Sequence, residues 1–324
     1  MQAVSLADET MEEALAFSRA TFGARSYQAQ PSYLAWLYED NPWSAGHGAC
    51  RLLMEDGRIV GIIHNMQLPV SLDGTECTLS VLHNLILDPG YRGGMGILFA
   101  RQEVSRQALM FAPGMQGDYR EAFRKFRYRE FRGQALRRIL RPVHGAATKA
   151  ARRAGLAGES LVLRGDPARG VHARVPPGLR AAFAERSGLH RIMRAEDVEP
   201  FVAWRYFSES GPRHVLIHDE ATGAFCLCSV GVRHGFNVAR IMELVDATPG
   251  FLSDRVVPAL RRLKAHLLLA FVWDGDIAGA LAGIGMRATE NPVSSFQAGK
   301  LSRQVDIVPQ SGISDYGFEA LLTA

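Results

Sequence analysis

The chain contains 324 residues, of which 47% are hydrophobic and 22% charged, and it carries a formal net charge of +4. These proportions are typical of a globular protein long enough for two domains, and they exclude a disordered or fibrous chain. The sequence has no apolar run long enough for a transmembrane segment and no signal-peptide pattern at its acidic start, so we expect a cytoplasmic location. The four cysteines lack the spacing of a metal site, so we expect no metal.

Two parts of the chain show the same order of predicted elements. A helical pattern ends at Trp36 and Tyr38 in the first half, and a second one ends at Trp204 and Tyr206. Two strand patterns follow each aromatic pair, at 49–54 and 59–67 in the first half and at 214–218 and 224–233 in the second. This shared order predicts tandem repeats of one fold.

A glycine-dense turn joins an apolar strand to a helix in the first half. The strand pattern ends before Asp88-Pro89, and the helical pattern begins at Ile97. The turn between them reads Tyr91, Arg92, Gly93, Gly94, Met95, Gly96. Such turns let backbone N–H groups approach an anion, and the dipole of the following helix adds attraction. We therefore predict a phosphate-binding turn, with a purely structural turn as the alternative.

Matching elements follow in both halves. After the first helix we expect a strand at 108–112 and a second helix at 119–131, and in the second half a helix at 254–265 and a strand at 267–273. The last helix of the second half ends at Gly285, which can supply a left-handed C-cap, and Arg127 stands in its place in the first half. Where the second half should carry its glycine-dense turn, 246–253 has one glycine and no arginine.

The turn lacks the Gly-Lys-Ser/Thr ending of nucleoside triphosphatases and the glycine spacing of dinucleotide-binding proteins. It resembles the pyrophosphate loop of the GCN5-related N-acetyltransferases, or GNATs, in which an apolar strand, a proline and Arg-Gly-x-Gly-x-Gly/Ala precede a helix. The register differs, because either Arg92 sits one residue too close to the glycines or Met95 replaces one of them. The loop would therefore hold coenzyme A in an altered geometry, or hold it poorly.

The resemblance implies an α/β (α+β) fold with two tandem GNAT-like domains, each a mixed, mostly antiparallel twisted sheet flanked by helices. We expect a first domain at 1–168 with the pyrophosphate loop and a degenerate second domain at 169–324 without it. Function is therefore expected in the first domain, with the second as a structural partner or one wall of a substrate cleft.

The resemblance also implies direct transfer of an acyl group from acetyl-CoA, or another acyl-CoA, to an amine. The donor would be held by Leu85, Ile86, Leu87, Arg92, Gly93, Gly94, Met95, Gly96 and Ile97. His83 and Asn84 occupy the region of the family's base, although His83 is equally consistent with a hydrogen-bonded core histidine. The family's tyrosine acid aligns with Phe123, which leaves Tyr119 and Tyr128 as candidate proton donors.

Three residues are candidates for substrate binding. Trp36 and Tyr38 are first of all structural anchors, with a minor substrate role left open. Glu243 is a carboxylate on an apolar strand, so it is either a paired buried charge or a group facing a cleft.

Several partners are consistent with an acyltransferase. The acceptor would be a small-molecule amine, an amino sugar or an amino acid, and the protein a monomer or homodimer. The basic segment 120–153 could instead dock an acidic acyl carrier protein as the donor, and a non-catalytic GNAT-fold binding protein is the third hypothesis. No motif for nucleic acid is present, so we expect none as a partner.

Overall fold

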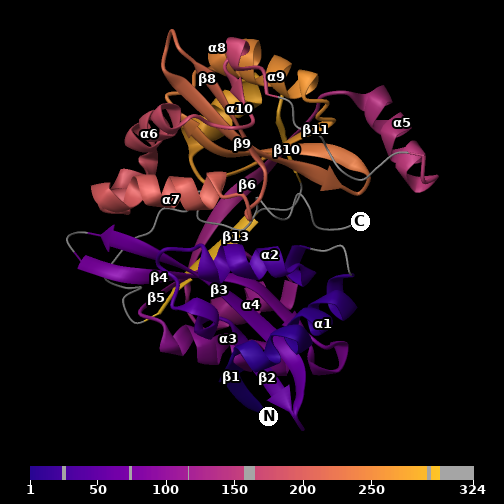
Figure 1. Cartoon of the computed structure of the whole chain (residues 1–324), viewed down its shortest axis with the longest axis vertical. Coiled ribbons are helices and arrows are strands. Elements are labelled where there is room, and N and C mark those ends of the chain that lie inside the picture. The colour runs from indigo at the N-terminus through magenta and orange to yellow at the C-terminus, as the bar shows by residue number, and fades with distance from the viewer. Residues whose placement is uncertain (24–26, 73–74, 116, 157–164, 290–292, 300–324) are drawn as a thin grey trace. The chain divides into compact units, whose positions relative to one another are not determined.

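The computed structural model describes residues 1–23, 27–72, 75–115, 117–156, 165–289 and 293–299 (Figure 1). These residues form two compact units that do not follow the order of the chain. Unit 1 contains Met1–Arg132, His190–Gly211 and the segment that begins at Ser294, and unit 2 contains Gly133–Leu189 and Pro212–Val293. The domain boundary after residue 168 stays a prediction, since it concerns the sequence repeats rather than these contact-defined units.

The sheet of unit 1 is antiparallel except for one parallel pair, β4 with β5. Its strand order is β1 (Gln2–Ser5), β2 (Arg51–Glu55), β3 (Arg58–Leu72), β4 (Thr75–Leu87), β5 (Leu109–Met115), β13 (Val293–Ala298). Its helices are α1 (Met11–Phe22), α2 (Pro31–Leu34) with a π-helical turn at Ala35–Glu39, α3 (Gly94–Arg106), α4 (Gly117–Lys125) and α7 (Ala195–Phe207). Leu53, Ile63, Phe99, Phe123 and Phe296 lie in its apolar core.

Unit 2 repeats this plan. Its strand order is β6 (Arg129–Ile139), β11 (Leu267–Val272), β10 (Phe236–Val245), β9 (Ala224–Arg233), β8 (His214–Asp219), β7 (Val171–His172), with β12 (Arg287–Ala288) also paired to β6. Its helices are α5 (Pro142–Arg153), α6 (Pro177–Arg186), α8 (Pro249–Phe251), which continues through Leu252–Val256 into α9 (Val257–Arg262), and α10 (Gly275–Gly283). In Figure 1, α8, α9 and α10 gather beside strands β8 to β11, and their apolar residues share one core with those strands.

Matching features identify β4 and β10 as equivalent strands. Each pairs antiparallel with the preceding strand and parallel with the following one. Each also has one irregular position in the antiparallel ladder, at Asn84 in β4 and at Met242 in β10. The expected plan of two matching sheets flanked by helices is therefore present.

The two halves of the chain exchange segments between the units. Strand β6 follows α4 in sequence but pairs with β11 of unit 2, and β13 returns from the second half to pair with β5 of unit 1. The helix predicted over 119–131 is wrong at its end, because α4 stops at Lys125 and β6 begins at Arg129. Arg127 terminates α4 by adopting a left-handed φ of 59°.

The ends of α4 and α10 show the same hydrogen-bond pattern. The N–H of Tyr128 donates to the carbonyl of Phe123 at 3.2 Å, and the N–H of Met286 donates to that of Leu281 at 3.1 Å. Gly285 adopts the predicted left-handed conformation at φ 79°, and it does so without strain because glycine has no Cβ. Arg127 has a Cβ, so the same kind of conformation is strained there.

We therefore expect Arg127→Gly to raise the free energy of unfolding by about 0.5 kcal/mol, because relief of the left-handed strain outweighs the flexibility that glycine adds to the unfolded chain. Urea denaturation monitored by circular dichroism measures this change. The matched variant Gly285→Ala should lower the free energy of unfolding by a similar amount. A destabilised Arg127→Gly protein would show that the arginine side chain contributes more than its backbone costs.

Candidate active site

The glycine-dense turn connects β4 to α3 in unit 1. The N–H of Asp88 donates to the carbonyl of Val60 at 2.9 Å, which makes Asp88 the last residue tied to the ladder with β3. Its carboxylate accepts a hydrogen bond from the N–H of Gly90 at 2.9 Å and closes a 3-10 turn over Pro89–Tyr91. The Tyr91 hydroxyl donates to Glu55 on β2. The turn is thereby fixed at its start and in its middle.

Helix α3 begins with N–H groups that have no acceptor in the preceding turn. Its first backbone bond runs from the N–H of Ile97 to the carbonyl of Gly93 at 3.2 Å. The N–H groups of Gly94, Met95 and Gly96 precede that bond, and Gly93, at φ 87°, provides no side-chain cap. Such a helix end attracts an anion through its N–H donors and its dipole.

Gly96 is the glycine that the packing requires. A Cβ at this position would lie 2.1 Å from Cδ1 of Leu87 and 2.4 Å from the hydroxyl oxygen of Tyr119. A Cβ at Gly94 would meet nothing within 4 Å. The absence of a side chain at Gly96 therefore lets α3 start close against β4 and α4, whereas Gly94 borders open space.

Strands β4 and β5 separate before they reach the turn. Their parallel pairing covers only Leu79–Val81 of β4 and Leu109–Phe111 of β5. The hydrogen bond of Asp88 to β3 fixes the alternation of the antiparallel ladder, so the N–H groups of Leu85 and Leu87 point away from β3. These two donors face the side from which β5 has departed.

A cavity of about 320 Å³ opens at this separation. It is lined by Thr21, Phe22, Leu85, Ile86, Leu87, Arg92, Gly93, Ile97 and Tyr119. Six of these residues belong to the donor-binding set predicted from sequence, and Tyr119 to the catalytic set. Met95, the residue that departs from the family pattern, is not among the lining residues and leaves the cavity open.

The predicted catalytic residues occupy different environments. Asn84 lies at the irregular position of β4 with φ 47°, and the next residue, Leu85, lines the cavity. His83 pairs with His64 of β3 through the backbone, and its side chain lies outside the described part of the structure. Tyr119 is half-buried and reaches the cavity from α4.

Phe123 and Tyr128 lie away from the cavity lining. Phe123 is fully buried and contacts the rings of Tyr128 at 5.3 Å and Phe296 at 5.5 Å. Burial raises the pKa of Tyr128, whose ring also packs against Phe126. Of the two tyrosines predicted as proton donors, the structure therefore brings only Tyr119 to the cavity.

The predicted substrate-binding residues are placed in two units. Trp36 is 0% exposed and stacks on Trp204 of α7 at 5.1 Å. Tyr38 is also buried, and burial raises its pKa well above the ordinary value. Glu243 follows the irregular position of β10 in unit 2 and is half-buried. Their roles in binding a substrate stay predictions.

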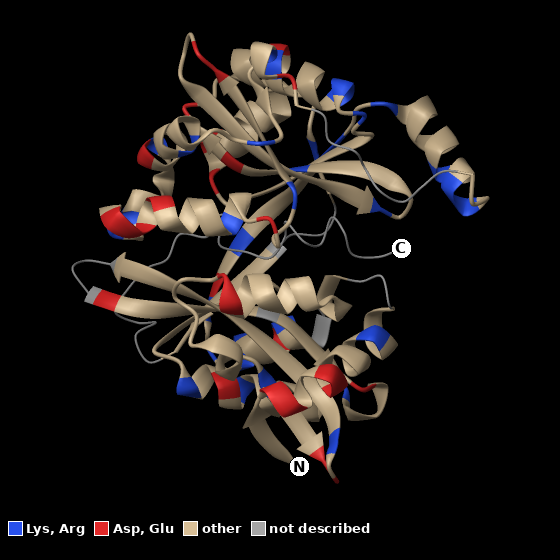
Figure 2. Cartoon of the chain, in the orientation of Figure 1, with Lys and Arg blue, Asp and Glu red and all other residues tan. Residues whose placement is uncertain are grey.

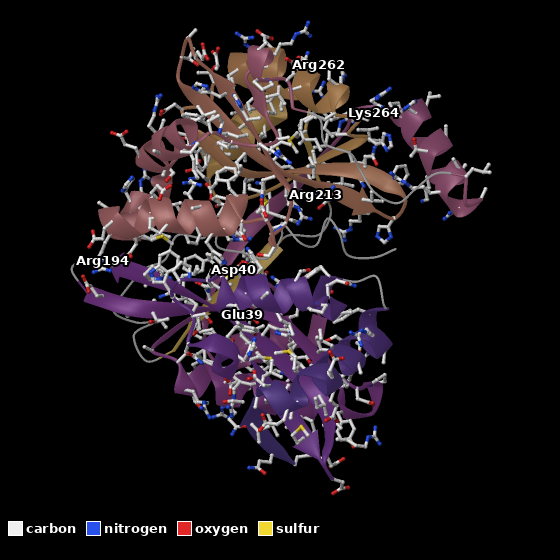
Figure 3. All side chains as sticks on the ribbon, viewed as in Figure 1. Glu39, Asp40, Arg194, Arg213, Arg262 and Lys264 are labelled. Atoms are coloured by element: carbon white, nitrogen blue, oxygen red, sulfur yellow. The ribbon has the colours of Figure 1, made fainter. Side chains whose placement is uncertain are left out.

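Further contacts hold the residues that flank α7 to the rest of unit 1. Asp40, labelled in Figure 3, accepts hydrogen bonds from the hydroxyls of Ser208, at 3.4 Å, and Ser210. The N–H of Ser71 donates to the carbonyl of Ile192 at 2.9 Å. The recurring Trp-x-Tyr motifs thus lie in one unit and pack against each other.

His64 is a functional candidate that the sequence did not single out. It is 2% exposed, and its Nδ1 lies 2.9 Å from the hydroxyl oxygen of Tyr38. Burial lowers the pKa of His64 from 6.5 to about 3. The imidazole is therefore neutral in the folded protein at physiological pH.

The lowered pKa of His64 predicts that the folded protein loses stability as the pH falls. As the pH falls below 6.5, the unfolded chain binds a proton at His64 and the folded chain does not until the pH nears 3. The contribution of His64 to the free energy of unfolding is complete above pH 6.5. It decreases by about 1.4 kcal/mol per pH unit as the pH falls from 6.5 toward 3. His64→Gln should therefore flatten the dependence of the free energy of unfolding on pH between 6.5 and 4.5, measured by urea denaturation. Equal slopes for His64→Gln and the parent protein would contradict the prediction.

Unit 2 closes the equivalent helix end with its own side chain. The hydroxyl of Thr248 accepts the N–H of Phe251 at 3.1 Å, and Pro249 has no N–H to offer. The donors that stay available at α3 are thus partly used or missing at α8.

Within the described ranges no group of three or more metal-ligating side chains occurs, and no helix there has the length and hydropathy needed to cross a membrane.

Comparison with solved structures agrees with this architecture. Saccharomyces cerevisiae N-myristoyltransferase with bound myristoyl-CoA aligns with a TM-score of 0.57 at 10% identity, over 92% of this chain and 82% of that one. A GCN5-related N-acetyltransferase from Anabaena variabilis aligns with a TM-score of 0.52 at 10% identity, over 91% and 72% of the chains. A tandem GNAT protein from the clavulanic acid biosynthesis pathway aligns with a TM-score of 0.51 at 14% identity, over 92% and 98%.

These similarities show that the chain has the tandem GNAT fold. The resemblance inferred from the glycine-dense turn is thereby confirmed at the level of the fold. No family model and no curated protein matches the sequence.

Proposed function

We propose that the protein is an acyl-CoA-dependent N-acyltransferase, with acetyl-CoA as the first donor to test and with its active site in unit 1. One observation carries the proposal: Gly93 and Ile97, which flank the open N–H groups at the start of α3, line the same cavity as Leu85 and Leu87, whose N–H groups point away from β3. This combination suits a ligand with an anionic end and a long polar arm. Three solved structures with this fold are named as acyltransferases or acetyltransferases, and one contains myristoyl-CoA.

The donor would lie along the path that these groups define. Its pyrophosphate would accept hydrogen bonds from the N–H groups of Gly94, Met95 and Gly96, with Arg92 at the rim of the cavity supplying positive charge. Its pantetheine arm would follow Leu85 and Leu87, and the thioester would approach the irregular position of β4. An N–H of β4 would stabilise the charge that develops on the carbonyl oxygen.

Apart from the C–N bond that forms and the C–S bond that breaks, acyl transfer requires only the movement of protons. The neutral amine attacks the thioester carbonyl carbon, the C–N bond forms, the C–S bond breaks, and the proton lost by nitrogen ends on the coenzyme A sulfur. His83 remains the predicted base. Tyr119 is the better-placed proton donor, because it lines the cavity and Tyr128 does not.

We expect coenzyme A release to depend on an added amine and on Tyr119. Tyr119→Phe should lower kcat by about 100-fold while the KM for acetyl-CoA stays close to the parent value. The assay follows free thiol with a colorimetric reagent and identifies the acylated amine by mass spectrometry. Tyr128→Phe is the matched control. No amine-dependent thiol release from a broad amine panel, with coenzyme A binding intact, would support a non-catalytic binding protein instead.

A carrier-protein donor is the second candidate, because segment 120–153 contains twelve arginines and lysines against two acidic residues. Figure 2 shows basic residues at the C-terminal end of α5, where Arg153 is exposed. Such a segment would dock an acidic acyl carrier protein through charge, so capture of acylated carrier protein should fade as salt rises. The cytoplasmic location and the monomeric or dimeric state stay predictions.

A further inference from the structure

A cluster of polar side chains surrounds the irregular position of β4 in unit 1. The side-chain amide of Asn84 donates to the hydroxyl of Tyr27 at 3.1 Å and to the hydroxyl of Tyr33 at 3.2 Å. Its carbonyl oxygen accepts a hydrogen bond from Nε2 of Gln28 at 3.4 Å. Asn84 holds a left-handed φ of 47°, a conformation that asparagine tolerates better than most residues. Three partners therefore fix the side chain at this position.

Two polar atoms at this cluster have unused hydrogen-bonding capacity. Gln28 is 1% exposed, and its Oε1 has no hydrogen-bond partner among the described residues. His64 contacts the ring of Tyr33 at 5.5 Å, and its Nε2 likewise has no partner within the described part of the chain. A buried polar atom without a partner costs free energy, so its retention calls for an explanation such as a ligand.

The side chains of the cluster are electrically neutral at physiological pH. Two phenols, two amides and a neutral imidazole offer hydrogen bonds without a cation or a carboxylate. A carboxylate or an ammonium brought here would lose its hydration without gaining a countercharge from the cluster. A hydroxyl group would both donate and accept without that penalty.

The cluster adjoins the proposed path of the donor. Asn84 is half-buried, and the adjacent Leu85 lines the cavity. If the thioester approaches the irregular position of β4, an acceptor bound to the cluster would place its amine beside the carbonyl carbon. This step rests on the proposed function.

We propose that Tyr27, Gln28, Tyr33 and Asn84 form the acceptor subsite, that Oε1 of Gln28 accepts a hydrogen bond from an acceptor hydroxyl, and that the acceptor is a hydroxylated amine such as an amino sugar. An amino acid is disfavoured, because its carboxylate would find no cation among the described side chains of the cluster. Gln28 is then a specificity-determining residue rather than a group that takes part in bond making.

Binding of three primary amines that differ in their polar groups tests this assignment. Glucosamine carries neutral hydroxyls, glutamate carries carboxylates, and cyclohexylamine carries neither. Saturation-transfer NMR and calorimetric titration of the full chain, with and without coenzyme A, give their affinities. We expect glucosamine to bind at least about tenfold more tightly than the other two amines.

Gln28→Leu removes Oε1 while approximately keeping the volume of the side chain. It should abolish the preference for glucosamine and leave the affinity for coenzyme A unchanged. Gln102→Leu, at an exposed position on α3, is the control for added hydrophobicity. Equal affinities for the three amines, tighter binding of glutamate, no binding of glucosamine, or a preference that survives Gln28→Leu would overturn the assignment. Failure of coenzyme A to bind would instead count against the proposed function, since the amine titrations are also made without it.

Discussion

Gly96→Val is expected to lower the free energy of unfolding by about 2–3 kcal/mol and to abolish binding of coenzyme A. A new Cβ would occupy space held by Leu87 and Tyr119, at 2.1 Å and 2.4 Å from their nearest atoms. Leu87 is buried in the core of unit 1, so only part of the overlap can be relieved by movement within the core. The remaining movement would bring Leu87 and Tyr119 into the cavity that they line.

Gly94→Val separates this effect from a general cost of branched side chains at a helix start. A Cβ at Gly94 meets nothing within 4 Å, so the unfolding midpoint of Gly94→Val in urea should stay near that of the parent protein. Calorimetric titration with coenzyme A then compares binding by the variants. If Gly96→Val were as stable as Gly94→Val and still bound coenzyme A, the close approach of α3 to β4 would not be needed for the site.

Trp36→Ala should have the largest effect on stability, a loss of about 3–5 kcal/mol. Trp36 is 0% exposed, and its ring stacks on that of Trp204 at an interplanar angle of 18°. The indole N–H of Trp36 donates to the carbonyl of Trp204 at 3.4 Å, and the indole N–H of Trp204 donates back to the carbonyl of Trp36 at 2.7 Å. Gly211 packs so closely that a Cβ there would lie 2.7 Å from Nε1 of Trp36.

The loss should appear as a lower urea midpoint for unit 1, followed by near-ultraviolet circular dichroism of its tryptophans. Trp36→Phe keeps much of the buried area and should cost less than the alanine variant. Trp43→Ala, at a half-buried tryptophan of the same unit, is the second control. A Trp36→Ala protein as stable as Trp43→Ala would show that the paired indoles do not hold α7 to this unit.

The candidate site was largely predictable because its signals are local in sequence. Glycine spacing, the apolar strand before it and the amphipathic pattern after it identify the start of α3 and the residues that line the cavity. Gly285 is likewise predictable as a helix terminus, since only the residue at that position has to adopt the left-handed conformation. The recurrence of Trp-x-Tyr indicated equivalent helices but could not show that the two indoles stack on each other.

The parts of the fold and of the site that the sequence did not predict depend on contacts between residues distant in sequence. Strand β6 was predicted as helix over its first three residues, 129–131, because its four arginines obscure the alternation of a strand. Its role as a strand of unit 2 is fixed by pairing with β11, more than a hundred residues later. The cluster around Asn84 was missed for the same reason, because Tyr27 and Gln28 lie 57 and 56 residues from it.

Calorimetric titration with coenzyme A and with pantetheine tests the central claim most directly, because pantetheine lacks the pyrophosphate that the N–H groups of α3 would bind. We predict that coenzyme A binds at least about a hundredfold more tightly than pantetheine, and that Arg92→Ala narrows this difference. Equal binding of the two compounds, or no binding of coenzyme A, would contradict an anion site at the start of α3.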